Sequence, residues 1–356
     1  VSGRRNIVIN GAMQVAQRAT SATGLGANAT TNTYPTVDRW NPFHGGTTAG
    51  RYTMTQTADG PSGFANCMKL DCTTADTSIA AGEEFLISHK LEGQDLQAIG
   101  KGTSDAKQLV VSWYAKGTPK TYGIEMYDND NTRHFTNTWT VTSSWQRFTQ
   151  VIPADTTGAF DDDNALSLYI LFWLHGGSNF TSGSSASSWA SVTAANRAVG
   201  VGSFFSSTDN ELFITGVQME VGSVATPFEH RSFGEELALC QRYFYRDQNT
   251  TAEYKRYVVM NVDTAVNARG NYFLPIPMRV HPTLAVVGQL SSYSAGSIRN
   301  LSTTLAINPS YAQASVSAGF HTVCLFAVVG SGQTAGHASG LIANNAVSSL
   351  SFDAEL

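Results

Sequence analysis

Three consecutive acidic residues form the one stretch of the sequence that resembles a metal site. Asp161, Asp162 and Asp163 are followed directly by Asn164. Hard cations such as calcium take several oxygen ligands, and carboxylate and amide oxygens can supply them. The stretch lacks the glycine and the final Glu of an EF-hand loop, and acidic turns between strands are common. A solvated turn is therefore the simpler interpretation, and a structural calcium ion is the alternative.

A second set of residues has the chemistry of a sugar platform. The alternation of the strands that carry them predicts that they point away from the core, whereas Leu109 and Trp113 point into it. If the strands are neighbours, the set shares one face, where aromatic rings can stack on sugar rings and polar groups can bind hydroxyls. The alternative is that a second layer, a loop or another subunit covers these rings. The glycan-binding candidates are Tyr114, Glu125, Tyr127, Tyr169 and Trp173.

Known catalytic patterns do not occur in the sequence. The eight histidines never fall in HxxxH or HExxH arrangements, and no GxSxG nucleophile motif is found. The glycines between positions 330 and 340 follow a predicted strand but open no helix, which argues against a phosphate-binding loop. A glycosidase pair of carboxylates can come from distant parts of a chain, but nothing points to a pair. We predict that the protein is not an enzyme.

Composition narrows the class of protein further. Only 14% of the 356 residues are charged, against roughly 25% in an ordinary globular domain. The net charge is −5 and no block of Lys or Arg occurs, so we expect no nucleic-acid partner. The longest apolar run, Leu166–Leu174, has the length of a buried strand, so we expect no membrane insertion. The four cysteines form no CxxC pair and are expected to be small buried residues.

Strand patterns dominate the elements that must position these residues. Alternating runs start at positions 108, 122, 145, 166 and 213, with turn chemistry every 8 to 12 residues or so, which is typical of a sandwich or jelly roll. After one helical stretch the pattern resumes at 256–266, 271–280, 283–290, 303–308, 320–329 and 347–356. The predicted fold is all-β, with an N-terminal jelly-roll β-sandwich (1–230) and a smaller C-terminal β-sandwich (247–356), joined by one short helix (231–246).

The joining helix has a clear start signal. Ser232 and Glu235 have the Ser-x-x-Glu spacing of a capping box, and the helix is predicted over Phe233–Phe244. Helical spacing gives an apolar stripe at Phe233, Leu237, Cys240 or Gln241, and Phe244, with Glu236 and Arg242 outside it. The stripe is expected to pack on one sandwich or both.

Four passages carry a resemblance to a known family. RNIVINGAMQVAQR from Arg5, TYPTVDRW from Thr33, the stretch Ile214–Phe244 and the final SFDAEL resemble a domain found in tail fibres and related structural proteins of tailed bacteriophages. The phrases SSWQRFT and VQMEVG are also similar to jelly-roll carbohydrate-binding modules, which often hold a structural calcium ion. The resemblance implies a virion component with a lectin-like sandwich that assembles as a homotrimer with other virion proteins. It brings no catalytic residues.

Together these observations predict a function in binding. The first hypothesis is a tail-fibre or receptor-binding subunit of the virion that recognises a glycan on the host cell surface. The second is a decoration or cement protein of the capsid or tail that binds no ligand and buries the same aromatic face in an interface. The third, a polysaccharide depolymerase, has the least support in the sequence.

Overall fold

The chain is nearly all β, which confirms the predicted class. A computed structural model describes residues 4–26, 33–250, 255–294, 297–300, 306–307, 320–329, 331–343 and 348–356. The chain divides into two compact units, here called unit 1 (residues 1–236 with Leu356) and unit 2 (residues 237–355). In the described residues no helix is long and apolar enough to cross a membrane.

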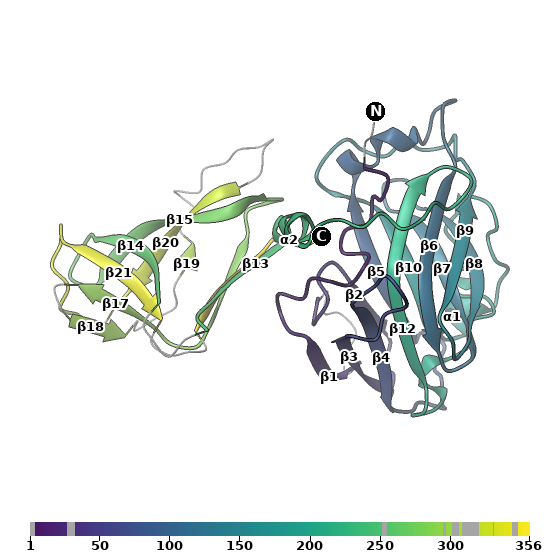
Figure 1. The fold of residues 1–356 in the computed structure, drawn as a ribbon, viewed down its shortest axis with the longest axis horizontal. Helices are drawn as coiled ribbons and strands as arrows, with labels where there is room; N and C mark the ends of the chain where they lie inside the picture. Colours follow the sequence, from purple (N-terminus) through teal and green to yellow (C-terminus); the bar gives the residue numbers. More distant parts are fainter. Residues whose placement is uncertain are drawn as a thin grey trace. The chain divides into compact units, whose positions relative to one another are not determined.

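Unit 1 is a sandwich of two antiparallel sheets (Figure 1). In sheet A the strand order is β1 (Ser21–Leu25), β3 (Arg51–Thr57), β4 (Cys67–Thr74), β12 (Glu211–Val221), β6 (Leu109–Gly117) and β9 (Gln146–Ile152). In sheet B it is β11 (Ala190–Ser191), β8 (Arg133–Val141), β7 (Lys120–Asp128), β10 (Leu166–Gly176), β5 (Glu84–Glu92) and β2 (Asn41–Gly45).

The core of unit 1 follows from the alternation of its strands. Val111 and Trp113 of β6 pack with Ile170 and Phe172 of β10 in one cluster, and each is at most 1% exposed. Successive side chains of a strand point to opposite faces, so the intervening residues of β10 must lie on the outer face of sheet B. The packing of the core therefore determines which side chains of β10 lie on the outer face of sheet B.

The segment between β10 and β12 covers part of that outer face. It contains the short helix α1 (Ser178–Thr181), strand β11 and the 3₁₀ turns η3 (Ala194–Asn196) and η4 (Phe204–Ser206). Phe180 packs on Trp173 with ring centroids 5.4 Å apart. Two further 3₁₀ turns, η1 (Gly93–Asp95) and η2 (Gln97–Ile99), follow β5.

The helix α2 (Phe233–Gln241) starts as predicted and ends earlier than predicted. The backbone N–H of Ser232 donates to Glu235 Oε2 (3.1 Å), and the N–H of Glu235 donates to Ser232 Oγ (3.3 Å), so the capping box forms. Phe244 is the first residue of strand β13, not of the helix. The predicted stripe is wrong at Phe233, which is 58% exposed, and at Glu236, which is only 4% exposed.

Glu236 is buried because it belongs to a polar network that ties the N-terminal segment to β12. It accepts from the backbone N–H of Asn10 (2.6 Å) and pairs with Arg231 (3.1 Å). Beside it, Ile7 N–H donates to the carbonyl of Met219 (2.9 Å). Gly11 is needed there, because a Cβ at this position would lie 2.0 Å from the carbonyl oxygen of Val217. The N-terminal segment and the segment that follows β12 thus meet in one network.

Among the described residues, unit 2 contains one antiparallel sheet of three strands and one of seven. One has the order β13 (Phe244–Gln248), β22 (Ser349–Asp353) and β16 (Thr283–Val287). The other has the order β18 (Ser297–Asn300), β17 (Leu290–Ser294), β21 (Ala338–Ala343), β14 (Arg256–Val262), β15 (Asn267–Met278), β20 (Phe320–Val328) and β19 (Ala306–Ile307). Of the strand predicted at 303–308, positions 306 and 307 are in β19 and the rest lies outside the described residues.

Unit 2 has its own core. Tyr272 of β15 stacks on Phe352 of β22 with ring centroids 4.9 Å apart, and Leu341 of β21 is fully buried beside them in the same cluster. The glycine-rich stretch that ends at Gly340 lies outside every strand predicted from the sequence, but its last residues begin β21. The burial of Leu341 shows that one face of this strand points into the core. The glycines before it have no side chain, so the alternation that marks a strand in a sequence is missing there.

Candidate functional site

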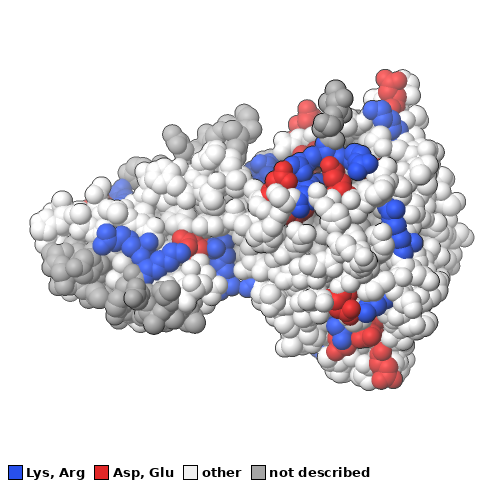
Figure 2. Space-filling model, viewed as in Figure 1, with Lys and Arg blue, Asp and Glu red and all other residues white. Residues whose placement is uncertain are grey.

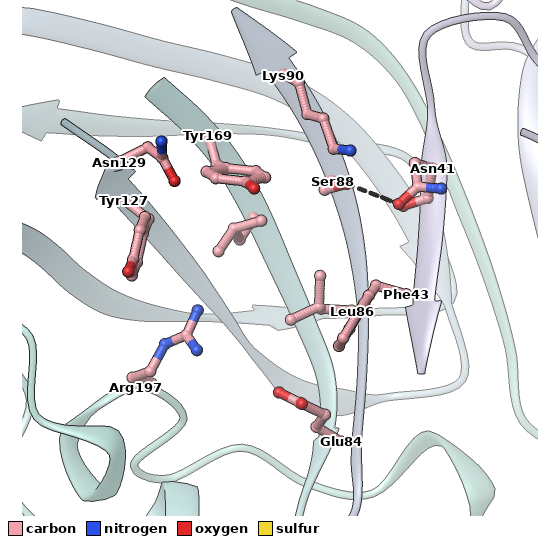
Figure 3. A pocket seen from close by; sticks show the side chains of 11 residues that line it. Asn41, Phe43, Glu84, Leu86, Ser88, Lys90, Tyr127, Asn129, Tyr169 and Arg197 are labelled. Carbon is pink, nitrogen blue, oxygen red and sulfur yellow. Dashed lines mark hydrogen bonds between the residues drawn. The ribbon is translucent and has the colours of Figure 1, made fainter. Parts of the chain in front are cut away.

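A pocket of about 380 Å³ lies on the outer face of sheet B in unit 1. It lies across four adjacent strands in the order β7, β10, β5 and β2, so residues distant in sequence meet there (Figure 3). Its lining residues are Asn41, Phe43, Glu84, Leu86, Ser88, Lys90, Tyr127, Asn129, Tyr169, Leu171 and Arg197.

The middle of the pocket is apolar and its sides are aromatic. Leu86 of β5 and Leu171 of β10 lie on the two central strands, and each is 4% exposed. Tyr127 and Tyr169 are directly opposite residues in the β7–β10 ladder, and their rings stand nearly perpendicular with centroids 5.7 Å apart. Phe43 forms the other side from β2, where it pairs with Leu86. Apolar surface is thus presented on three sides.

Polar side chains surround this apolar surface. Ser88 Oγ donates to Asn41 at a distance of 3.2 Å, which joins the neighbouring strands β5 and β2. The ammonium group of Lys90 lies 5.9 Å from the ring centroid of Tyr169. Asn129 Nδ2 donates to the carbonyl of Leu166 (3.1 Å), so its side-chain oxygen is held in a defined orientation. The pocket therefore offers both donors and acceptors at fixed positions.

Below the pocket lies a buried network centred on Glu125. Glu125 is fully buried and accepts from Trp173 Nε1 (2.7 Å) and from Arg197 Nε (3.0 Å), while its Oε1 lies 2.9 Å from His134 Nδ1. Burial works against the charge of Arg197, but the adjacent carboxylate outweighs it and raises the pKa of Arg197. Arg197 is therefore a permanent cation, and its guanidinium lies 5.1 Å from the ring centroid of Tyr127.

The structure separates the five predicted glycan-binding candidates into three groups. Tyr127 and Tyr169 line the pocket. Glu125 and Trp173 share the same face of sheet B but are 0% exposed, because the segment after β10 covers them. Tyr114 lies on β6 in sheet A, which places it on the other sheet of the sandwich. The assumption that all their strands are neighbours was therefore wrong for Tyr114.

Several lining residues were not predicted from the sequence. Glu84, Leu86 and Ser88 alternate along β5 with buried core residues, so a period of two in that stretch was the available signal. Arg197 follows η3 in a segment rich in Ser, Ala and Gly, and no periodicity marks it. Its role depends on the three-dimensional path of the chain over sheet B.

The acidic run lies in the turn that leads into β10. Asp161, Asp162 and Asp163 are exposed, and Asp163 Oδ1 accepts from the backbone N–H of Ala165 (2.8 Å). Among the described residues, no three or more His, Cys, Asp or Glu side chains are placed to hold a metal ion. Calcium binding by this turn stays a prediction, which a calorimetric titration tests.

Comparisons with known proteins give similarities of fold only. No family model matches the chain, and no curated protein matches it. A solved enzymatically active domain of tailspike protein 4 from bacteriophage CBA120 is 12% identical, with a TM-score of 0.32 over 62% of this chain and 22% of that one. The chain thus spans about a fifth of the length of that solved domain.

Carbohydrate-binding modules are also among the similar structures. One is TmCBM61 in complex with β-1,4-galactotriose, which is 7% identical, with a TM-score of 0.31 over 61% of this chain and 99% of that one. Another is the xylan-binding CBM22-1 domain of Paenibacillus barcinonensis Xyn10C, which is 11% identical, with a TM-score of 0.28 over 59% of this chain and all of that one. At these identities and scores the likenesses carry no argument about function, which rests on the pocket.

Proposed function

We propose that unit 1 is a glycan-binding module and that the pocket on the outer face of sheet B is its binding site. The observation that carries the proposal is the combination of an apolar centre, aromatic sides and fixed polar groups in one hollow. A sugar ring has an apolar C–H face and a rim of hydroxyls, so it needs this combination. The volume of about 380 Å³ is near the lower end of the range for small-ligand pockets, about 300 to 1,000 Å³, and suits a short stretch of a glycan.

We further propose that the module belongs to a phage virion, as a tail-fibre or receptor-binding subunit that recognises a glycan on the host cell surface. This part is supported by the sequence resemblance of the passages near both ends of unit 1 and of the final six residues. Assembly as a homotrimer with other virion proteins would place several pockets on one particle. Many weak sites then give strong attachment without any single tight contact.

Binding without catalysis is the activity that we propose. Glycoside hydrolysis usually needs two carboxyl groups that reach the scissile bond. Glu84 is the carboxylate that lines the pocket, whereas Glu125 is fully buried and both of its oxygens accept from protein groups. This arrangement supports a binding site and gives no support to a depolymerase. A decoration protein without a ligand stays the alternative, and it predicts no binding on a glycan array.

Replacement of a pocket tyrosine tests the proposed site. Tyr169→Ala removes one aromatic side of the pocket and is expected to weaken the binding of array-selected glycans at least tenfold, about 1.4 kcal/mol. The measurement is isothermal titration calorimetry with purified full-length protein. Tyr114→Ala removes a tyrosine from the other sheet and is the matched control, with affinity expected to stay within about twofold. Equal affinities of the wild type and Tyr169→Ala would remove this pocket as the site.

A further inference from the structure

An unmatched donor and an unmatched acceptor face each other at one end of the pocket. Arg197 and Glu84 both line it, and Figure 3 shows the guanidinium and the carboxylate turned towards the space between them. In the described part of the chain, neither a hydrogen bond nor an ion pair within 4.0 Å joins them. They are nevertheless close enough for each charge to act on the pKa of the other group.

Arg197 is held in place from behind. Its Nε donates to both oxygens of Glu125, at 3.0 and 3.1 Å, and its guanidinium lies 4.9 Å from the ring centroid of Trp173. A guanidinium carries five N–H groups, and this contact uses only the one on Nε. Within the described residues the two terminal amino groups have no hydrogen-bond partner in the protein. The four N–H donors of the terminal amino groups thus have no protein acceptor among the described residues, and the contact of Nε with Glu125 restrains the guanidinium that carries them.

Glu84 has its position because its partner across the ladder has no side chain. Gly45 pairs with Glu84 between β2 and β5, and a Cβ at Gly45 would lie 2.3 Å from Glu84 Oε1. The carboxylate therefore occupies space that any other residue at position 45 would fill. Within the described residues, the carboxylate of Glu84 accepts no hydrogen bond from the protein. Partial burial raises the pKa of Glu84, as expected for an acceptor that lacks a protein donor.

We propose that this end of the pocket selects an uncharged sugar residue whose hydroxyl groups bridge Arg197 and Glu84. A hydroxyl both accepts and donates, so one hydroxyl or a neighbouring pair can accept from the guanidinium and donate to the carboxylate. A sugar carboxylate in the same place would be attracted by Arg197 but repelled by Glu84, and a sugar amine would be attracted by Glu84 but repelled by Arg197, so neither satisfies both side chains as a hydroxyl does. Like charges held together in a binding site are strongly disfavoured. The inference rests on the proposed function and names its ligand class.

A glycan array with matched charges tests the selectivity. Neutral hexose oligosaccharides are printed beside their counterparts with a carboxylate at C6 and beside their counterparts with an amine at C2. For each backbone that binds, we expect the affinity of both charged forms to be at least tenfold lower. A charged form that binds as well as its neutral parent overturns the inference but leaves glycan binding intact. A lack of binding to every oligosaccharide overturns the proposed function, and this inference with it.

Two variants connect the selectivity to the named groups. Glu84→Gln keeps the size of the side chain and one acceptor oxygen but removes the charge, so the preference for the neutral form over the C6 carboxylate is expected to fall at least fivefold. Gly45→Ala, which displaces the carboxylate, is expected to lower the preference as well. Glu211→Gln in sheet A is the matched control and should leave the preference unchanged. An unchanged preference in Glu84→Gln refutes the inference, even if Tyr169→Ala weakens binding at least tenfold as expected.

Discussion

Replacement of Glu125 by Gln should destabilise unit 1 strongly, although the two side chains have nearly the same shape. Glu125 is fully buried. Its Oε2 accepts from Trp173 Nε1, and both of its oxygens accept from Arg197 Nε. A glutamine has one acceptor oxygen and one NH2 donor, so in either orientation a donor faces another donor. The substitution also leaves the cation of Arg197 without its partner, and such a loss in a buried pair costs about 3 to 5 kcal/mol.

The tryptophans of the chain make unit 1 easy to follow alone. All six, which include Trp173, lie within residues 1–236. Urea denaturation followed by tryptophan fluorescence on the full-length protein is therefore a measurement of unit 1. Thermal unfolding followed by the same fluorescence gives the melting temperature of unit 1. For a domain of this size each kcal/mol shifts this temperature by about 2 to 4 °C, so Glu125→Gln is expected to lower it by about 10 °C.

A matched substitution separates this effect from the mere loss of a charge. Glu211 pairs with Lys69 at 3.1 Å, but its side chain is 42% exposed. Exposed pairs of this kind contribute about 0 to 1 kcal/mol, so Glu211→Gln should hardly change the free energy of unfolding. If Glu125→Gln costs less than about 1 kcal/mol, the buried network does not hold Arg197, and the reasoning about the pocket loses its support.

Two further predictions concern buried charges in unit 1. Burial lowers the pKa of His44 to about 4 and also lowers that of His175, so the folded state binds fewer protons than the unfolded state below pH 6.5. Stability should therefore fall between about pH 6.5 and pH 4, with His44 contributing about 3 kcal/mol; urea midpoints across this range measure it, and a His44→Phe variant with the same pH profile would contradict it. Lys101, whose side chain is 2% exposed and whose Nζ lies 2.5 Å from Asp128 Oδ2, balances a buried carboxylate. Lys101→Met should cost about 3 to 5 kcal/mol by the same fluorescence assay, against a small effect of the exposed Lys107→Met; equal effects would refute this.

The strands with the clearest alternation could be predicted from the sequence. In β10, Ile170 and Phe172 enter the core while Tyr169, Leu171 and Trp173 face outwards, as a period of two requires. This information is local, because each side chain's direction depends only on its neighbours along the strand. The sequence alone therefore predicts which side chains of such a strand point into the core and which point away from it.

The set of residues that lines the pocket could not be predicted from the sequence in the same way. Strand order depends on long-range pairing, which placed Tyr114 in a different sheet from Tyr127. Burial outside the core depends on what passes over the sheet, and the segment that covers Trp173 has no hydrophobic period. The burial of Glu236 in α2 could not be predicted either, because its partner Arg231 precedes the helix and lies outside the helical pattern.

The network that joins the N-terminal segment to β12 also bears on how the chain folds during synthesis. Asn6 Oδ1 accepts from the backbone N–H of Met219, and Arg231 donates to the carbonyl of Val8, so these contacts close loops of more than 200 residues. Ribosomes add about 5 to 20 residues per second, so the first segment waits on the order of 10 to 40 s for its partners. Unit 1 therefore completes its fold late, because the edges of β4 and β6 that pair with β12 stay open until Glu211–Val221 has been made.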